Sequence, residues 1–404
     1  MSKVVKIGDI ASLKTGPFGT QFSAKEYTSE GIPVINVKNI GYGQVLENEL
    51  DYILESTRDR LSEHILKTGD IVFGRKGSVD RHAYISENYN GWVQGSDCIR
   101  LRFQEDVNTR YISHYLKLDH VKKQINHASI GSTMASLNTD ILKNIKIILP
   151  ELSVQNSIES ALSSLESKVD VNSKICFELE AMAKAIYDYW FVQFDFPDEN
   201  GKPYRTSGGE MVWNEQLNRE IPKGWEVTNI GKITANFDSR RIPLSQNERN
   251  SMKGDIPYYG ATGVMDYVDQ FIFDGQYVLI AEDGSVMDDD GHPIVQMIWG
   301  KTWVNNHAHV LEGCNGYSNE LLYFVLKDIP VIKIMTGSIQ KKINQDNLNN
   351  YKIPQIPHEI ANQFTSILKT IFSKLRAIEI ENSELTKLRD WLLPMLMNGQ
   401  AKVE

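Results

Sequence analysis

Two long stretches of the chain carry apolar residues at alternating steps of four and three, which is the spacing of a heptad seam. The first runs from Ile158 to Trp190 and the second from Phe364 to Leu392, and no proline interrupts either one. The residues expected on the two seams are Leu162, Leu165, Val169, Asn172, Leu179, Ile186, Leu368, Ile371, Leu375, Ile378, Asn382 and Leu385. The pattern predicts two long helices, each with one narrow apolar stripe.

Each predicted helix is about 55 Å long at 1.5 Å per residue. A stripe this narrow is not stable alone in water, so we expect the two helices to pack on each other as a coiled coil. Asn172 and Asn382 fall on the seams, where a buried polar pair fixes the register. The alternative is that each helix lies separately on a globular core.

The chain also repeats itself at a constant offset of 206 residues. The segment GSTMASLNTDILKNIKI around Gly131 matches GSIQKKINQDNLNNYKI around Gly337. The matched pairs are Gly131 and Gly337, Ser132 and Ser338, Asn138 and Asn344, Asp140 and Asp346, Leu142 and Leu348, Asn144 and Asn350, and Ile147 and Ile353. A proline-bearing loop and then a predicted long helix follow both copies. The repeat predicts two related halves with a pseudo-twofold relation.

Short strand patterns ended by turns precede each copy of the repeat. Segments 31–37 and 69–74 in the first half have counterparts at 255–260 and 275–281 in the second. We therefore predict an α+β fold of two similar globular domains separated by two long antiparallel helices. The predicted boundaries are 1–150 for the first domain, 151–190 for the first helix, 191–225 for a central connector, 226–357 for the second domain and 358–404 for the second helix.

The negative net charge of the chain argues against a simple nucleic-acid-binding protein, since such proteins are usually basic. The 404 residues carry a net charge of −9. Residues 1–150 hold 19 Lys and Arg against 17 Asp and Glu, whereas 226–357 hold 11 against 16. The second domain therefore needs a local basic patch or help from partners to bind DNA.

The cysteines and the hydropathy pattern point to a cytoplasmic location. Cys98, Cys176 and Cys314 are odd in number and lack the spacing of a metal site, which predicts reduced thiols. No apolar run reaches the length of a membrane span or of the core of a signal peptide.

None of the candidate catalytic or ligand-binding motifs has the spacing that its chemistry requires. Gly300-Lys301-Thr302 lacks the leading glycine of a phosphate-binding loop, because position 295 is valine. Asp288-Asp289-Asp290-Gly291 fails the spacing of a calcium loop, and a polar turn is the better interpretation. His307 and His309, with His292 nearby, would bind a metal only if they shared one face of a strand. We expect neither a catalytic residue nor a metal ligand.

The central segment YWFVQFDFPDENGKPYRTSGGEMVWNEQLNREIPKGWEV, from Tyr189 to Val227, closely resembles the central region of type I restriction-modification specificity subunits. The matching elements are Trp190-Phe191, Phe194-Asp195-Phe196-Pro197, Gly201-Lys202-Pro203-Tyr204, Ser207-Gly208-Gly209 and Ile221-Pro222-x-Gly224-Trp225. The repeat motif and Leu66-Lys67-Thr68-Gly69-Asp70-Ile71 also resemble this family. The resemblance covers essentially the whole chain and is weakest inside the globular domains.

This resemblance implies a DNA-recognition subunit without catalysis of its own. Each domain would read one half of a split target in double-stranded DNA, and the helices would set the spacing and dock two methyltransferase subunits. Those partners would use S-adenosylmethionine to methylate adenine, and restriction subunits would bring ATP- and Mg-dependent cleavage. No cofactor is expected on this chain.

Candidate DNA contacts come from basic and hydroxyl residues beside glycine-rich turns. Arg and Lys bind guanine in the major groove, while Lys, Arg and hydroxyls contact phosphates. The candidates are Lys14, Thr15, Arg75, Lys76, Ser78, Arg81, His82, Arg240, Arg241, Ser285, His307, Lys341 and Lys342. For each of them, a solvated charged surface is the alternative.

Two other functions compete with the specificity subunit. A nuclease or lone methyltransferase would bind metal or S-adenosylmethionine as the isolated chain. A scaffold that binds only proteins would assemble without regard to DNA sequence.

Overall fold

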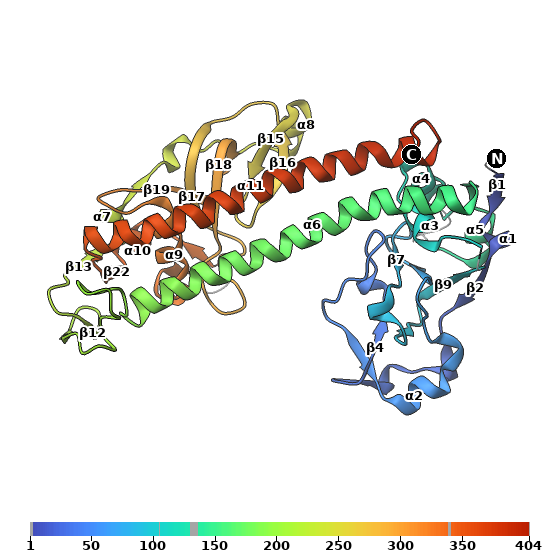
Figure 1. Cartoon of the computed structure of the whole chain (residues 1–404), viewed down its shortest axis with the longest axis horizontal. Helices are drawn as coiled ribbons and strands as arrows, with labels where there is room; N and C mark the ends of the chain where they lie inside the picture. The colour runs from blue at the N-terminus through green and yellow to red at the C-terminus, as the bar shows by residue number, and fades with distance from the viewer. Residues whose placement is uncertain (1–2, 105, 130–135, 338–340, 404) are drawn as a thin grey trace. The chain divides into compact units, whose positions relative to one another are not determined.

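A computed structural model describes residues 3–104, 106–129, 136–337 and 341–403. The chain folds into two compact units (Figure 1). The first comprises Met1–Asn172 and Glu381–Glu404, and the second comprises Ser173–Ile380. Each unit therefore holds one globular domain together with a part of both long helices.

The first unit contains two four-stranded sheets, in the orders β2-β9-β6-β7 and β3-β5-β4-β8, and the separate pair β1 and β10. Its strands are β1 Lys3–Lys6, β2 Ala11–Thr15, β3 Tyr27–Thr28, β4 Ile32–Ile35, β5 Asp51–Ile53, β6 Ile71–Gly74, β7 His82–Tyr84, β8 Val93–Gln94, β9 Cys98–Phe103 and β10 Lys146–Leu149. Its shorter α-helices are α1 Ile7–Ile10, α2 Glu55–Arg60, α3 Thr109–Leu116, α4 Asp119–Ala128 and α5 Thr139–Asn144.

The second unit is built around one six-stranded sheet, in the order β14-β19-β17-β18-β15-β16. Its strands are β11 Met211–Asn214, β12 Arg219–Pro222, β13 Val227–Asn229, β14 Thr234–Asn236, β15 Lys253–Tyr259, β16 Val264–Val268, β17 Phe273–Ala281, β18 Val295–Val304, β19 Ala308–Gly313, β20 Met335–Thr336, β21 Lys342–Ile343 and β22 Lys352–Pro354. Its shorter α-helices are α7 Ile230–Ile233, α8 Gln246–Ser251, α9 Asn319–Lys327 and α10 Gln345–Asn350.

The strand orders of the two units match, which confirms the predicted α+β fold with an internal repeat. The order β2-β9-β6-β7 corresponds to β14-β19-β17-β18, and β5-β4-β8 corresponds to β16-β15-β18. In both units one strand pairing is parallel, β4 with β8 and β15 with β18. The single strand β18 therefore takes the places of both β7 and β8.

The repeated asparagines have a local structural role, because each begins a short helix. Asn138 accepts a hydrogen bond from the backbone N–H of Ile141 at the start of α5 (2.9 Å). Asn344 does the same for Asn347 at the start of α10 (2.7 Å). Asparagine is a favoured N-cap, since its side chain satisfies a backbone donor that the helix leaves free. Three other members of the repeat, Gly131, Ser132 and Ser338, lie outside the described residues.

The two predicted long helices are α6, Leu152–Tyr187, and α11, His358–Met397. All the expected seam residues lie buried or half-buried. Asn172 donates to the side-chain oxygen of Asn382 (2.8 Å) within the first unit. In that unit the start of α6 packs against the end of α11, and in the second unit the end of α6 packs against the start of α11. The helices are therefore antiparallel partners.

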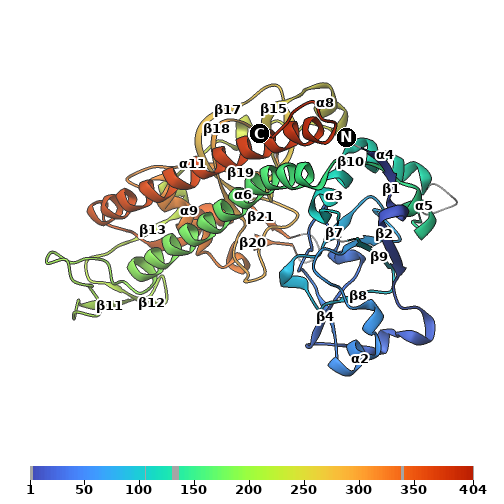
Figure 2. The same ribbon diagram turned by 45° about the vertical axis from the view of Figure 1, so that its right-hand side comes forward.

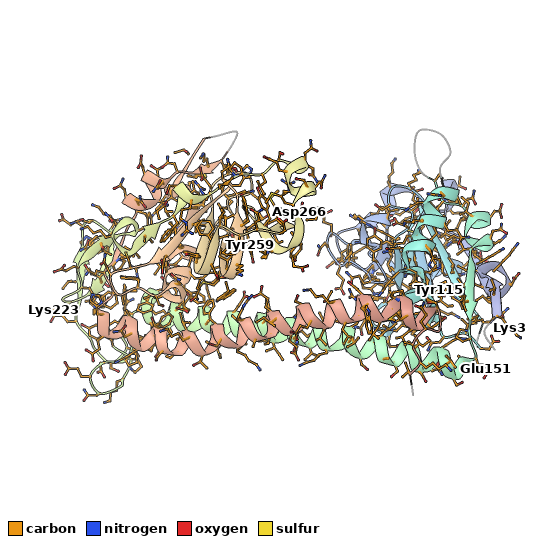
Figure 3. All side chains as sticks on the ribbon, turned by 90° about the horizontal axis from the view of Figure 1, so that it is seen from above. Lys3, Tyr115, Glu151, Lys223, Tyr259 and Asp266 are labelled. Carbon is orange, nitrogen blue, oxygen red and sulfur yellow. The ribbon has the colours of Figure 1, made fainter. Side chains whose placement is uncertain are left out.

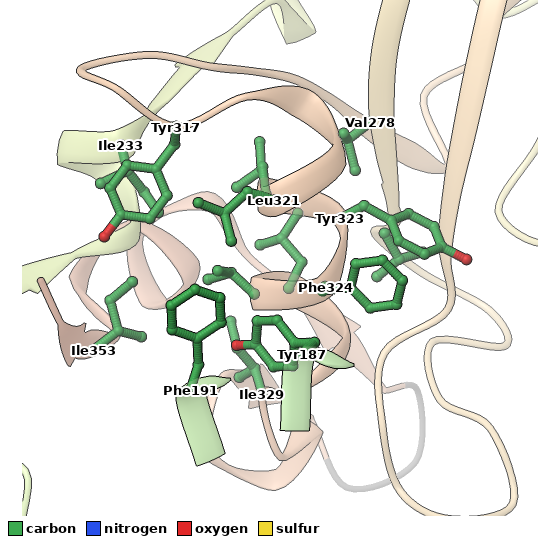
Figure 4. Close-up of a cluster of buried hydrophobic side chains, with 14 of the residues drawn as sticks. Tyr187, Phe191, Ile233, Val278, Tyr317, Leu321, Tyr323, Phe324, Ile329 and Ile353 are labelled. Carbon is green, nitrogen blue, oxygen red and sulfur yellow. The ribbon is translucent and has the colours of Figure 1, made fainter. Parts of the chain in front are cut away.

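In each unit a helix fills the space between the sheet and the long helices. In the second unit this is α9 (Figure 2), whose Leu321 and Phe324 share one buried cluster with Val278 of β17 and Tyr187 of α6 (Figure 4). The ring of Phe324 stacks on Tyr187 of α6 (5.7 Å between centroids). In the first unit α3 holds the same place, and its Ile112 joins the core formed with the start of α6.

The connector is ordered by stacked aromatic rings. Phe196 stacks on both Tyr204 (4.9 Å) and Trp225 (5.2 Å), and Asp195 accepts a hydrogen bond from the backbone N–H of Thr206 (2.7 Å). The hairpin β11–β12 completes this region, which Lys223 marks in Figure 3. These contacts explain why the central motif combines aromatic residues with tight turns.

None of the described helices combines the length and the apolarity that crossing a membrane requires.

Candidate nucleic-acid interface

Three loops of the first unit meet at one edge of its sheet. Strands β2 and β6 both run antiparallel to β9, and their last residues, Thr15 and Gly74, pair with Ile99 and Cys98 at its start. The loops that follow β2 and β6 therefore lie beside the loop that precedes β9. This edge brings together residues that are far apart in the sequence.

Basic side chains contact exposed aromatic rings on the loops after β2 and β6, on the connection between β4 and β5, and on α4. The guanidinium of Arg75 lies over the ring of Phe18 (4.8 Å), and that of Arg81 lies over the ring of Tyr42 (5.4 Å). The ammonium of Lys122 also contacts Tyr42 (4.7 Å). Phe18 and Tyr42 are 42% and 44% exposed, so both rings are accessible to a ligand. We call Phe18, Tyr42, Arg75, Lys76, Arg81 and Lys122 the basic loop surface.

The remaining candidates of the first domain are distributed differently. Ser78 is exposed on the same turn as Arg75. Lys14 and Thr15 lie on β2, and Lys14 forms an ion pair with Glu63.

His82 does not fit the expected DNA contact, because its side chain is fully buried. Its Nε2 is 2.9 Å from the hydroxyl of Ser113. Burial lowers the pKa of His82 to about 3, so the imidazole is neutral near pH 7. The backbone carbonyl of His82 accepts a hydrogen bond from the N–H of Gly43 (2.8 Å), so His82 helps to hold the turn that carries Tyr42.

Two backbone hydrogen bonds of Arg75 hold the turn after β6 in place. Its N–H donates to the carbonyl of Asp97 (2.8 Å), and its carbonyl accepts the N–H of Leu137 (2.9 Å). Two residues on, Gly77 has φ +77°, a left-handed conformation that favours glycine.

The turn after β17 in the second unit has the same backbone connections. The N–H of Glu282 donates to the carbonyl of His307 (2.8 Å), and its carbonyl accepts the N–H of Ile343 (2.8 Å). Gly284 has φ +76°. The turns at 75–78 and 282–285 are therefore structural equivalents. The equivalent pairs are Arg75 and Glu282, Lys76 and Asp283, Gly77 and Gly284, Ser78 and Ser285, Asp97 and His307, and Ser136 and Lys342.

Arg241 also departs from the expected exposed contact, since it is held in a nearly buried ion network. Its Nη1 donates to Glu282 (2.6 Å) and to the carbonyl of Ala308 (2.7 Å), and its side chain is only 12% exposed. Lys342 forms an ion pair with the other oxygen of Glu282 (2.8 Å). Both cations therefore neutralise the largely covered carboxylate of Glu282.

The other candidates of the second domain lie nearer the surface. Arg240 is exposed and lies over the ring of Phe273 (4.7 Å). Ser285 and His307 are exposed at the turn, and the Nδ1 of His307 is 2.6 Å from Asp283. Lys341 is half-buried. Ser285, His307, Lys341 and Lys342 thus gather around one turn, and Arg240 lies apart from it.

Asp238, Glu282 and His309 are close enough together to hold a metal ion. However, His309 Nδ1 is 2.5 Å from Asp238, and its Nε2 is 2.9 Å from the carbonyl of Ile343. Both imidazole nitrogens already have partners, and Arg241 lies against both carboxylates. The geometry describes an ion network with a charged histidine better than a metal site.

His309 should make the stability of the second unit depend on pH. Burial is the largest single effect and lowers its pKa, but the hydrogen bonds to Asp238 and Ile343 and the charges of Asp238 and Glu282 together outweigh burial, so the pKa is raised. The stabilisation is fully present below the pKa of the unfolded state, about 6.5, and is lost as pH rises through the higher pKa of the folded state. We expect urea denaturation to show the second unit weakening above pH 6.5. His309→Gln should remove that component, and an unchanged slope in this variant would contradict the assignment.

Sequence reasoning missed Phe18, Tyr42 and Lys122. A signal was present for the two aromatics, because each sits in a tight turn: Pro17-Phe18-Gly19 and Gly41-Tyr42-Gly43. Core aromatics usually lie within strands or helices, so aromatics flanked by glycine in a polar loop favour an exposed role. Lys122 gave no such signal, since it is one of several polar residues on α4.

Comparison with known proteins agrees with this architecture. The family model for the type I restriction modification DNA specificity domain matches twice, over residues 2–181 and 222–388. The MjaIX specificity subunit of a type I restriction enzyme from Methanocaldococcus jannaschii is 24% identical over all of this chain and 94% of its own length. The HindI specificity subunit from Haemophilus influenzae is 21% identical over 90% of this chain and 94% of its own.

A solved structure shares the fold. The crystal structure of the S subunit of a type I restriction-modification system from M. genitalium superposes with a TM-score of 0.58 at 16% identity, covering 98% of this chain and 96% of that one. The family model covers most of the chain, in two copies that follow the repeat seen in the fold. The chain therefore belongs to the family of non-catalytic DNA specificity subunits of type I restriction-modification systems.

Proposed function

We propose that each globular domain reads one half of a two-part target in double-stranded DNA, and that the loops at the matched sheet edges make the contacts. The reading domains would be residues 1–150 and 226–357. The helices at 151–190 and 358–404, with the connector at 191–225, would set the distance between the two half-sites. A pseudo-twofold pair of readers suits DNA, because the two strands of a duplex are themselves related by twofold symmetry.

The observation that carries this proposal is the conserved backbone of the turns at 75–78 and 282–285 beneath different side chains. If the two turns served only the fold, nothing would favour different side chains on the same backbone. A common geometry with different side chains is what two readers of different half-sites need.

The two domains would contribute unequally to affinity. The basic loop surface places three cations beside two exposed rings, a suitable arrangement for contacting phosphates and bases. In the second domain Arg241 and Lys342 are occupied by Glu282, so fewer cations are free for phosphates. We therefore assign part of the DNA affinity of the complex to partner subunits.

The outer faces of the long helices would dock the two methyltransferase subunits. Phe177 on α6 and Trp391 on α11 are 71% and 59% exposed, and Val171 and Ile380 are also exposed. Large apolar side chains on a helix surface are typical of protein interfaces. S-adenosylmethionine would then belong to the methyltransferase subunits, and ATP and Mg to restriction subunits.

Phosphate contacts can be tested with the chain co-purified with its methyltransferase subunit. Arg81→Ala and Lys122→Ala should weaken binding to all DNA sequences alike, and each should reduce the slope of log affinity against log salt by about 1. Lys67→Ala is the matched control, since Lys67 is exposed at the opposite end of β6. If neither variant changes affinity or salt slope, the basic loop surface does not contact DNA.

A further inference from the structure

The equivalent turns at 75–78 and 282–285 carry opposite charges at the same positions. Arg75 and Lys76 in the first domain correspond to Glu282 and Asp283 in the second, while the glycine and serine that follow are identical. Neither local propensity nor backbone geometry explains the reversal, because the two turns share their hydrogen bonds and the φ of their glycine.

The side-chain pair across each turn is reversed as well. In the first domain Lys76 on the turn pairs with Asp97 at the start of β9 (3.4 Å). In the second domain Asp283 on the turn pairs with His307 at the start of β19 (2.6 Å). The cation of the turn in one domain is thus replaced by an anion in the other, and its partner changes type accordingly.

The first turn presents hydrogen-bond donors. The guanidinium of Arg75 lies over the ring of Phe18 (4.8 Å), and among the described residues its side chain has no hydrogen-bond or ion-pair partner. The planar guanidinium can donate two parallel hydrogen bonds, and in the major groove O6 and N7 of guanine accept such a pair.

The second turn presents acceptors. Glu282 is turned inward and neutralised by Arg241 and Lys342, which leaves Asp283 and His307 as the more exposed pair. Nδ1 of His307 is 2.6 Å from one carboxylate oxygen of Asp283, and the second oxygen of Asp283 is an acceptor whichever form the imidazole takes. Acceptors match the exocyclic amino groups of adenine and cytosine in the major groove.

We propose that this turn is the base-discriminating element of both domains, and that its reversed polarity makes Arg75 bind a guanine in one half-site and Asp283 accept a hydrogen bond from an adenine or cytosine amino group in the other. The inference rests on the proposed function. It adds to that function the two residues that determine specificity and the class of base edge that each one reads.

The test maps methylated adenines by single-molecule sequencing in DNA from cells that co-express the chain with its methyltransferase subunit. Asp283→Arg should move the preference at one position of one half-motif toward guanine and leave the other half unchanged. Arg75→Gln should relax one guanine position of the other half, by roughly 5- to 150-fold in discrimination. The matched controls are Asp274→Arg, at the opposite end of β17, and Lys67→Gln, at the opposite end of β6; both should keep the wild-type motif.

Two outcomes would overturn the inference. One is an unchanged motif in both turn variants. The other is loss of both half-motifs together while the controls remain active, because the turn would then serve folding or affinity and not base selection. Failure of the proposed function can be distinguished from failure of this inference, because the wild-type complex itself would then show no two-part methylation motif.

Discussion

Phe364→Ala is expected to lower the free energy of unfolding of the second unit by about 4 kcal/mol, which is the range for removing a fully buried phenylalanine. Phe364 of α11 is fully buried, and its ring contacts Phe191 (4.8 Å), Trp190 (5.4 Å) and Tyr187 (6.1 Å) between centroids. The substitution would leave a cavity where α11, the end of α6 and the start of the connector meet. A thermal melt should show the transition of this unit lowered by about 10 °C.

Ile367→Ala is the matched control for this experiment. Ile367 lies nearly one turn further along α11 and is 37% exposed, so its truncation should change the free energy of unfolding by less than about 0.5 kcal/mol. Equal effects of the two variants would mean that the aromatic cluster does not join α11 to the second unit.

Replacing residues 226–357 with the corresponding segment of a relative that has a different target is expected to change one half of the methylated motif and leave the other half intact. The structure favours such an exchange, because the first and last strands of the segment lie side by side. Strand β13 pairs with β22, and the N–H of Gln355 donates to the carbonyl of Glu226 (2.8 Å). Each base pair that the new domain no longer matches should cost about 1–3 kcal/mol in the old half-site.

The reciprocal exchange of residues 1–150 provides the control, and it should change only the other half. Strands β1 and β10 bring the ends of that segment together in the same way. A chimera in which both halves change, or neither does, would contradict independent reading by the two domains.

Features with local sequence signals were predicted well. The heptad spacing extends over many turns, so α6 and α11 and their pairing followed from the sequence. The offset repeat identified Asn138 and Asn344, whose capping role depends only on the next three residues. The central motif identified the family, since its aromatic residues and turns form one compact connector.

The candidate site was predicted less well, because its geometry depends on strand order. The contact of Arg75 with Phe18 arises only after β2, β9 and β6 align, which no local pattern reveals. His82 and Arg241 have the residue types of DNA contacts, yet burial of one and ion pairing of the other make them structural. The equivalence of the two turns was hidden because it lies at an offset of 207, one residue away from the repeat at 206.

The most direct test of the account is the methylation motif of the wild-type chain co-expressed with its methyltransferase subunit, mapped across a genome by single-molecule sequencing. Two reading domains on paired helices predict a two-part motif whose halves are separated by a gap of fixed length and unspecified sequence. A single undivided motif, or a gap that varies from site to site, would contradict the account.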